Sequence, residues 1–149
     1  MNRKMNYLHE RALRLVYCDY ESTFEDMLRK DRSLTFHQRN IHRVALEMYK
    51  VKNEPSPPFM KEIFKYIGDQ STRMGGKFAR PNINSVKKGE YSLSSFGPIV
   101  WNTMLPEKLK NCDSLTDFKQ SIKSWIPKDC PCHICKNYVR GLGYVEVFE

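Results

Sequence analysis

Residues 36–53 form one long amphipathic segment, which constrains the fold of this chain more than any other part of the sequence. Its apolar side chains recur every three or four residues, the spacing of one helix face, at Ile41, Val44, Ala45, Met48 and Tyr49. Thr35 and Gln38 stand three residues apart at its start, as in a capping box, where side chains and backbone amides of the first turn bond reciprocally. The sequence therefore predicts a long helix with one buried face.

Shorter helices are expected on both sides of this segment. Apolar residues at helical spacing place them at residues 4–18, 24–30, 59–64, 100–104, 105–109 and 114–125. The apolar face of the helix at residues 4–18 is expected to consist of Met5, Leu8, Ala12, Leu15 and Val16. Ser22 and Glu25 are expected to form a capping box for the second of these helices. Ser114 and Asp117 are expected to do the same for the last.

Between Gly68 and about Lys88 the chain has no regular periodicity. Glycine, proline and asparagine interrupt this stretch, and its cations are Arg73, Lys77, Arg80, Lys87 and Lys88. We expect an irregular basic loop with one short β-hairpin, formed by residues 77–80 and 91–94. Two roles remain open for this loop. It either lies along a phosphate backbone, with Phe78 stacked on a base, or serves as a plain surface linker.

The net charge of +8, from 25 Lys and Arg against 17 Asp and Glu, favours association with polyanions such as RNA or DNA. Two further pairs of cations, each four residues apart on a predicted helix, are candidate phosphate contacts: Arg39 with Arg43, and Lys119 with Lys123. The alternative is that these are solvated surface cations of a protein that happens to be basic. The charge thus indicates a nucleic-acid partner without proving which residues bind it.

Three of the five cysteines lie within six residues near the C-terminus, in the run Cys130-Pro131-Cys132-His133-Ile134-Cys135. Thiolates at this spacing are typical of a zinc knuckle, with Cys130, Cys132 and Cys135 as candidate ligands and zinc as the expected cofactor. His133 is a candidate fourth ligand, although it is adjacent to Cys132 and neighbouring residues rarely reach one tetrahedral centre. Cys112 or a partner molecule could supply that ligand instead. Reduced structural cysteines and a redox pair remain as alternatives.

These patterns predict a mainly α fold with several short amphipathic helices, an irregular basic loop and a C-terminal cysteine-rich knuckle. Trp101 and Trp125 both fall on apolar helical patterns, so they are expected to anchor the core and not to stack on bases. By composition the chain divides into a helical segment, a Pro/Gly-containing basic linker region, and a helical module with the cysteine cluster, at residues 1–54, 55–95 and 96–149.

No catalytic motif is recognisable, so we expect a non-enzymatic protein without a small-molecule substrate. The sequence lacks a Gly-rich phosphate loop and a GxSxG elbow, and Tyr17-Cys18-Asp19-Tyr20 lacks the second aspartate of two-metal phosphoryl transfer. His37 and His42 mark no nucleophile and are expected to be half-exposed helix residues. Because neither a secretory signal nor a membrane-length apolar run is present, we expect a nuclear or cytoplasmic location, no secretion and no membrane partner.

Four blocks of this sequence resemble, in the same order, the C-terminal regions of non-LTR retrotransposon polyproteins. They are Tyr7-Leu8-His9-Glu10-Arg11-Ala12-Leu13-Arg14, Glu47-Met48-Tyr49-Lys50-Val51-Lys52-Asn53, Phe96-Gly97-Pro98-x-x-Trp101-Asn102-x-x-Leu105-Pro106 and Cys130-Pro131-Cys132-x-x-Cys135. In those proteins this region follows an endonuclease and the fingers and palm of a reverse transcriptase. The resemblance covers nearly the whole chain.

The resemblance implies that residues 1–54 are similar to the end of a polymerase thumb, and that the rest is similar to the downstream C-terminal domain. It assigns RNA-templated DNA synthesis to upstream domains, since no position here matches their catalytic acids. We therefore expect a non-catalytic accessory fragment that binds RNA or DNA and associates with the upstream reverse-transcriptase domain. The alternative is a structural and protein-interaction module that is fully folded only against that polymerase domain.

Overall fold

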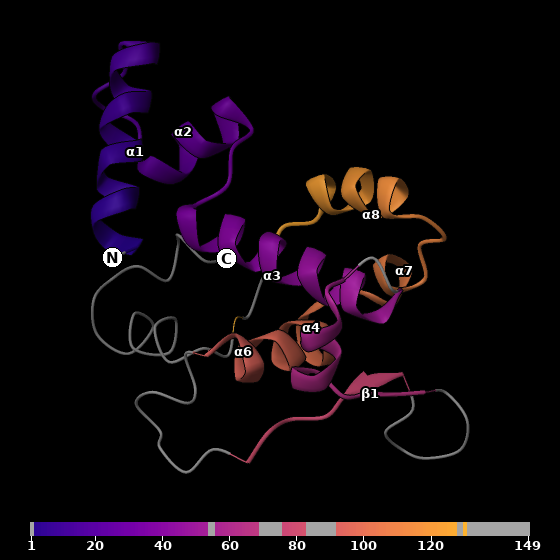
Figure 1. Cartoon of the computed structure of the whole chain (residues 1–149). Coiled ribbons are helices and arrows are strands. Elements are labelled where there is room, and N and C mark those ends of the chain that lie inside the picture. Colours follow the sequence, from indigo (N-terminus) through magenta and orange to yellow (C-terminus); the bar gives the residue numbers. More distant parts are fainter. Residues whose placement is uncertain (1, 54–55, 69–75, 83–91, 128–129, 131–149) are drawn as a thin grey trace.

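The computed structural model describes residues 2–53, 56–68, 76–82, 92–127 and 130, and these residues are mainly helical (Figure 1). The described helices are α1 (Asn2–Tyr17), α2 (Phe24–Asp31), α3 (Phe36–Lys52), α4 (Pro58–Ile63), α6 (Leu93–Ile99), α7 (Glu107–Lys110) and α8 (Leu115–Ser121). To these are added the π-helix η1 (Val100–Met104), the 3-10 helix η2 (Ile122–Ser124), and the strands β1 (Tyr66–Ile67) and β2 (Lys77–Phe78). The predicted mainly α fold class is confirmed. No helix of the described residues has the length and apolarity that a membrane span requires.

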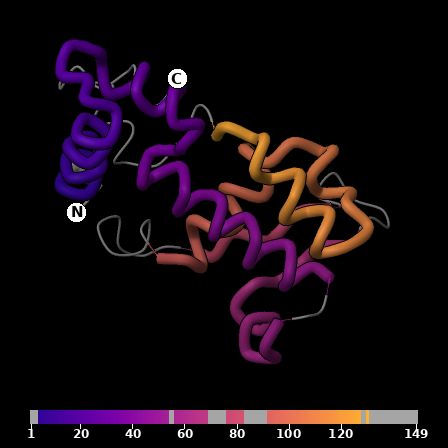
Figure 2. The backbone as a smooth tube through the Cα atoms, turned by 90° about the horizontal axis from the view of Figure 1, so that it is seen from above, coloured from indigo at the N-terminus to yellow at the C-terminus, as the bar shows by residue number. Residues whose placement is uncertain are grey.

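Helix α3 runs through the middle of the described structure, with α1 and α2 at its N-terminal end and α6 and α8 along its length (Figure 1, Figure 2). The capping box predicted at its start is present. The Thr35 hydroxyl accepts a hydrogen bond from the Gln38 amide at 3.2 Å, and the Gln38 side-chain oxygen accepts one from the Thr35 amide at 3.0 Å. The Phe36 amide donates to the Asn6 side-chain oxygen at 3.0 Å, which ties this helix start to α1.

One apolar core joins α3 to the elements that follow it in the chain. Its buried members are Ile41, Ala45, Met48, Tyr49, Val51, Phe64, Phe78, Val100, Trp101, Leu105, Leu109, Phe118 and Ile122. The buried face of α3 is the predicted one, with Val44 partly buried against the core. Helices α6 and η1 pack on one side of α3 and α8 packs on the other, so α3 is the element against which the later helices assemble (Figure 1).

A glycine allows α6 to approach α3 closely. A methyl group at Gly97 would lie 2.6 Å from the Met48 sulfur and 3.0 Å from a ring carbon of Phe64, both closer than ordinary van der Waals contact. Pro98 follows inside α6 and is buried, and the helix then widens into the π-helix η1. Gly97 and Pro98, which belong to one of the four blocks that resemble retrotransposon proteins, therefore have a packing role in this chain.

The short β-hairpin forms, but with a different partner from the predicted one. Strand β2 pairs antiparallel with β1, with Tyr66 opposite Phe78, whereas the predicted partner segment supplies Leu93 and Ser94 to helix α6. The Asn102 side chain also binds β2, because its amide nitrogen donates to the Phe78 carbonyl at 2.9 Å and its oxygen accepts from the Phe78 amide at 3.0 Å. Phe78 is fully buried, so the base-stacking role considered for it is wrong.

Helices α1 and α2 form a second, smaller core. Its buried residues are Leu13, Met27 and Leu28, with Tyr17 and Phe24 packed against them. The Tyr17 hydroxyl donates a hydrogen bond to the Asp31 carboxylate at 2.9 Å, which ties the end of α1 to the end of α2. These contacts determine which face of α1 is turned toward α2.

The apolar face predicted for residues 4–18 is not the buried one. Leu15 and Val16 are 67% and 71% exposed, and the other members of the predicted face are exposed as well: Met5, Leu8 and Ala12. Leu13, which the prediction left out, packs against α2 instead. The prediction failed because periodicity identifies an apolar stripe without showing which stripe meets a partner. The exposed set Met5, Leu8, Ala12, Leu15 and Val16 is called the α1 stripe below.

The N-cap of α2 is Thr23 and not the predicted Ser22. The Thr23 hydroxyl accepts from the Asp26 amide at 3.2 Å. Ser22 binds Asp19 and does not cap α2. Its hydroxyl donates a hydrogen bond to the Asp19 carboxylate at 2.7 Å, and its amide donates one to the same carboxylate at 3.0 Å. These bonds from Ser22, the amide first, lower the pKa of Asp19. The Asp19 carboxylate therefore stabilises the turn between α1 and α2.

The last described helices follow the prediction more closely. The Ser114 hydroxyl accepts from the Asp117 amide at 3.1 Å and caps α8. The helix ends at Ser121 and continues as η2, so the α-helix is shorter than the predicted range ending near Trp125. Trp101 is fully buried and Trp125 packs half-buried against the same core, which confirms both as core anchors.

Candidate functional site

The predicted phosphate-binding cations that the structure describes are all exposed. They are Arg39, Arg43, Lys77, Arg80, Lys119 and Lys123. The other three candidates, Arg73, Lys87 and Lys88, lie outside the described residues. The described cations belong to three places in the fold: the outer face of α3, the chain at β2, and α8 with η2.

Arg39 and Arg43 share the exposed face of α3, as predicted. Arg39 also has a structural contact, because its Nε donates to the Leu34 carbonyl at 3.0 Å and its Nη2 donates to Nε2 of His9 at 3.3 Å. Burial, and then the positive charge of Arg39, lower the pKa of His9, which favours the neutral ring that accepts this bond. Arg39 thus joins α3 to α1, whereas Arg43 presents its charge to solvent.

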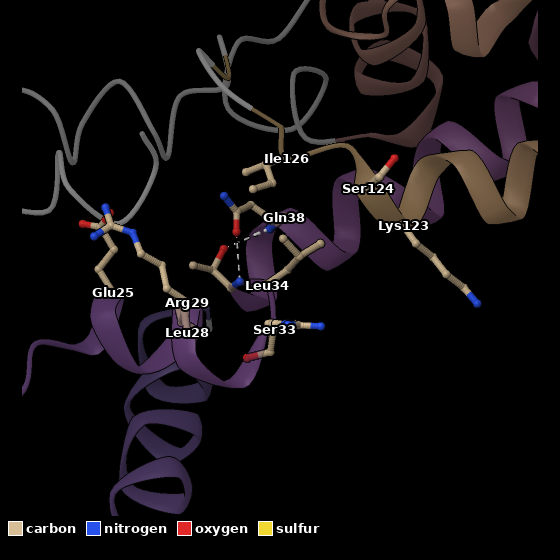
Figure 3. Close-up of a pocket in the computed structure, with 11 residues that line it drawn as sticks. Glu25, Leu28, Arg29, Ser33, Leu34, Gln38, Lys123, Ser124 and Ile126 are labelled. Carbon is tan, nitrogen blue, oxygen red and sulfur yellow. Dashed lines mark hydrogen bonds and ion pairs between the residues drawn. The ribbon is translucent and has the colours of Figure 1, made fainter. Parts of the chain in front are cut away.

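A pocket of about 400 Å³ opens where α2, the start of α3 and the segment around η2 meet (Figure 3). The residues that line it are Glu25, Leu28, Arg29, Arg32, Ser33, Leu34, Thr35, Gln38, Lys123, Ser124 and Ile126. Apolar side chains and cations both contribute to its wall. We call it the α2–η2 pocket.

The cations of the α2–η2 pocket differ in how far their charge is compensated. Arg29 forms ion pairs with Glu25 and Asp26. Arg32 and Lys123 are exposed, and neither forms an ion pair with a residue in the described ranges. The pocket wall therefore includes two cations, Arg32 and Lys123, that no described carboxylate pairs with. Figure 3 shows the Lys123 side chain extending away from the other labelled residues.

Sequence reasoning identified Lys123 but missed Arg29 and Arg32, because the pocket joins elements that lie far apart in the chain. Arg32 caps the end of α2 with its backbone in the left-handed region, at φ 54°. The sequence signal for it is the run Arg29-Lys30-Asp31-Arg32 at the end of a predicted helix. Cations in a last helical turn also interact favourably with the helix dipole, so that run alone does not distinguish a binding site from a helix end.

The C-terminal cysteine cluster is described only at Cys130, whose sulfur lies 3.4 Å from Nε2 of His37. The other candidate ligands lie outside the described residues: Cys132, His133 and Cys135. Cys18 and Cys112 are free thiols. Within the described ranges no three potential ligands gather at one point. The contact does join two potential zinc ligands that stand 93 residues apart in the sequence.

His37 is buried, with 5% of its surface exposed, so the expectation of a half-exposed ring was wrong. Cys130, which is 93 residues away in the sequence, contacts this ring, and helical periodicity does not indicate such a contact. His42 is half-buried as expected. Its ring stacks on Trp125 with 5.5 Å between ring centroids, and its Nε2–H donates to the Trp125 carbonyl at 2.8 Å.

The protein is expected to lose stability on acidification through about pH 6.5 because of His42. Burial lowers the pKa of His42 below the usual 6.5, and the hydrogen bond to the Trp125 carbonyl opposes this shift only in part. The unfolded chain then binds the proton more tightly than the folded chain, so protonation favours unfolding, by at most about 1.4 kcal/mol per pH unit.

His42→Gln should therefore reduce the fall in unfolding free energy between about pH 7.5 and about pH 5.5. Urea unfolding across this range measures the effect, with a chelator present so that release of bound metal does not contribute. An unchanged pH slope in the variant would contradict the assignment.

Comparisons of this chain with protein-family models, with curated proteins and with solved structures found no match. The resemblance to non-LTR retrotransposon proteins therefore stays a hypothesis. The function has to be inferred from the charges, contacts and burial of the chain's own residues.

Proposed function

We propose that this chain is a non-catalytic module that binds nucleic acid as an accessory part of a retroelement reverse transcriptase. The observation that carries the proposal is the α2–η2 pocket, where no described carboxylate pairs with Arg32 or Lys123. The net charge of +8 adds a long-range attraction toward phosphate backbones. The resemblance supplies the biological setting, in which polymerase chemistry belongs to upstream domains.

The proposed binding is electrostatic and depends little on the base sequence of the nucleic acid. Contacts from lysine and arginine to phosphates position a protein on nucleic acid but carry no base information. Phe78, the aromatic residue considered for base stacking, is unavailable because it is buried. RNA and single-stranded DNA are therefore expected to bind with similar affinities and with a strong dependence on salt.

The proposed function also includes zinc binding by the C-terminal cysteines. Cys130, Cys132 and Cys135 provide three thiolates at the spacing of a zinc knuckle. We propose that zinc binds there, since cysteine thiolates at this spacing are typical ligands of structural zinc.

The double variant Arg32→Gln/Lys123→Gln is expected to weaken binding of a labelled single-stranded RNA. It should also reduce the slope of log affinity against log salt by about 1.4, because each phosphate neutralised on a single strand accounts for about 0.7 of that slope. Fluorescence anisotropy between about 50 and about 200 mM salt measures both quantities.

The matched control is Lys4→Gln/Lys108→Gln, which removes the same charge from two exposed positions outside the pocket. A pocket-specific interaction predicts a smaller effect in the control than in the pocket variant. Equal effects would show that only net charge matters, and binding that is absent or insensitive to salt would contradict the proposed function.

A second candidate function is a structural module that packs against the polymerase domain, and the α1 stripe favours it. Its large residues are 38% to 71% exposed, from Met5 at the lower end to Val16 at the upper end. Contiguous apolar surface of this kind marks interaction sites. The occupant that fits best is the upstream reverse-transcriptase domain, because the resemblance identifies α1 with the end of the thumb of that domain.

Circular dichroism and urea unfolding of the isolated chain, with and without zinc, discriminate between the two candidates. A cooperative transition together with salt-dependent RNA binding supports the nucleic-acid module. A loose helical ensemble that gains no structure from zinc and binds no nucleic acid supports the structural module.

A further inference from the structure

We propose that the α1 stripe docks a single helix of a partner polypeptide, and that this helix carries acidic residues on both sides of its own apolar seam. The inference rests on the second candidate function, in which the stripe meets another protein. It is independent of nucleic-acid binding. It adds the chemistry that the partner has to present to α1.

The α1 stripe has the spacing of a seam between two helices. Met5 and Ala12 are seven residues apart. Leu8 and Leu15 are seven residues apart as well, so the four side chains follow one another at intervals of three and four residues. This is the a/d pattern of a coiled coil, in which side chains of one helix insert between those of the other. Ala12 is small, so a large side chain of the partner fits between Leu8 and Leu15.

Contacts on other sides of α1 fix this helix and leave the stripe uncovered by the described residues. Leu13 and Tyr17 pack on α2, and Asn6 accepts the hydrogen bond from the Phe36 amide at the start of α3. Figures 1 and 2 show α1 at the edge of the described structure, beside α2. The partner therefore meets a helix that is already formed and oriented, which reduces the entropy lost on binding.

Cations border the stripe along one edge. At 3.6 residues per turn, Lys4 and Arg11 lie next to the stripe on the side away from α2, and both are exposed. The Arg11 guanidinium lies 5.8 Å from the centroid of the Tyr7 ring. Glu10, the one acidic residue in the sequence of α1, already forms an ion pair within the helix. This edge is therefore positively charged.

The other edge of the stripe also carries positive charge. His9 lies at this edge, and its Nε2 is 3.3 Å from Nη2 of Arg39, an exposed residue of α3. The Asp31 carboxylate opposes this charge, but it affects the pKa of His9 less than Arg39 does. A docked helix therefore meets cations along both edges of the stripe. Glutamate or aspartate at its flanking positions would pair with them, as charges beside a coiled-coil seam do.

These charges make a second copy of the chain a poorer occupant than an acidic helix. In a parallel pair of α1 helices, Lys4 and Arg11 would face His9 and Val16 of the other copy, and in an antiparallel pair they would face each other. Neither arrangement forms an ion pair. A membrane surface also fits less well, because the stripe holds no aromatic residue, whereas interfacial helices typically bury Trp or Phe together with Leu.

The test uses the full chain and two labelled synthetic peptides, each three heptads long with leucine at positions a and d. One peptide has glutamate at positions e and g, and the other has lysine there, so like charges disfavour pairing of either peptide with itself. Fluorescence anisotropy is expected to show that the acidic peptide binds at least about tenfold more tightly than the basic one.

Leu8→Ser/Leu15→Ser is expected to weaken binding of the acidic peptide by at least about tenfold, because it removes apolar contacts without changing the charge. The two side chains are exposed, so their replacement leaves both cores intact. The matched control is Phe59→Ser/Ile63→Ser, which alters two apolar residues of α4 that are 57% and 50% exposed. It should leave the affinity unchanged.

Charge variants test the acidic flanks separately. Lys4→Glu/Arg11→Glu should weaken binding of the acidic peptide and strengthen binding of the basic one, because it reverses the charge along one edge of the stripe. Arg32→Gln/Lys123→Gln, which alters the α2–η2 pocket, should bind the acidic peptide as the wild-type chain does.

The remaining outcomes contradict the inference in distinguishable ways. Equal affinities for the two peptides, both lost in Leu8→Ser/Leu15→Ser, would overturn the acidic flanks and leave the stripe as a docking surface. Binding of neither peptide would count against the second candidate function as well, whereas salt-dependent RNA binding would still support the nucleic-acid module. Dimerisation that the serine variant abolishes would assign the stripe to a second copy. Binding to phosphatidylserine vesicles without binding to either peptide would assign it to a membrane surface.

Discussion

Trp101→Ala is expected to lower the free energy of unfolding by about 3–5 kcal/mol. Trp101 is fully buried and packs edge-on against Phe78, with 5.6 Å between ring centroids. The Lys52 ammonium lies 5.5 Å from the centroid of the same ring, so the indole joins η1, β2 and α3. Removing it leaves a cavity that the surrounding side chains fill only in part. Because domains are typically stable by about 5–15 kcal/mol, this decrease is a large share of the total.

Urea unfolding followed by far-ultraviolet circular dichroism measures the decrease. The matched control is Trp125→Ala, which removes the same side chain from a half-buried position where the ring stacks on His42. A clearly smaller decrease is expected there, because less apolar surface returns to water. Equal decreases in the two variants would contradict the placement of Trp101 at the centre of the core.

The features that sequence reasoning predicted correctly are set by residues close together in the chain. The Thr35 and Gln38 capping box of α3 is one example, and the Ser114 cap of α8 is another. Both depend on a hydroxyl and an amide within three residues, so local sequence is sufficient. The buried face of α3 was also predictable, because one stripe of that helix is clearly more apolar than the rest.

The features that were predicted wrongly depend on contacts between distant segments. The strand partner of β2 is β1, and the segment expected to pair with it begins α6 instead. The buried face of α1 is decided by Met27 and Leu28 of α2, and not by the apolar stripe of α1 itself. Periodicity alone carries no information on which of several apolar surfaces will meet.

In the candidate site, too, the features set by local sequence were predictable and those set by contacts between distant segments were not. The exposure of the described cations followed from their places on helices or in a loop. The α2–η2 pocket was not predictable, because it forms only when η2 is brought beside α2 by the packing of α8 on α3. The contact between His37 and Cys130 is similarly non-local, and no local spacing in the sequence indicates it.

Phe118→Ala is expected to lower the free energy of unfolding by about 3–5 kcal/mol and to loosen α8 from α3. Phe118 is the buried residue of α8, and its ring stacks on Tyr49 with 4.3 Å between centroids and 23° between planes. Urea unfolding measures the stability change, and hydrogen exchange should show faster exchange of the α8 amides than of the α3 amides. Lys119→Ala, at the next and exposed position, should change stability by less than about 0.5 kcal/mol.

A double-mutant cycle separates the stacking of the two rings from simple loss of volume. Phe118→Leu and Tyr49→Leu retain apolar side chains, so their coupling energy should report the aromatic pair, at about 0.5–1.5 kcal/mol. The Tyr49 hydroxyl also donates to the Cys112 carbonyl at 2.7 Å, and Tyr49→Phe measures that bond separately, at about 0.5–1.5 kcal/mol. A coupling energy of zero would show that the rings do not stack in solution. Helix α8 would then be held on α3 by its other apolar residues, such as Leu115.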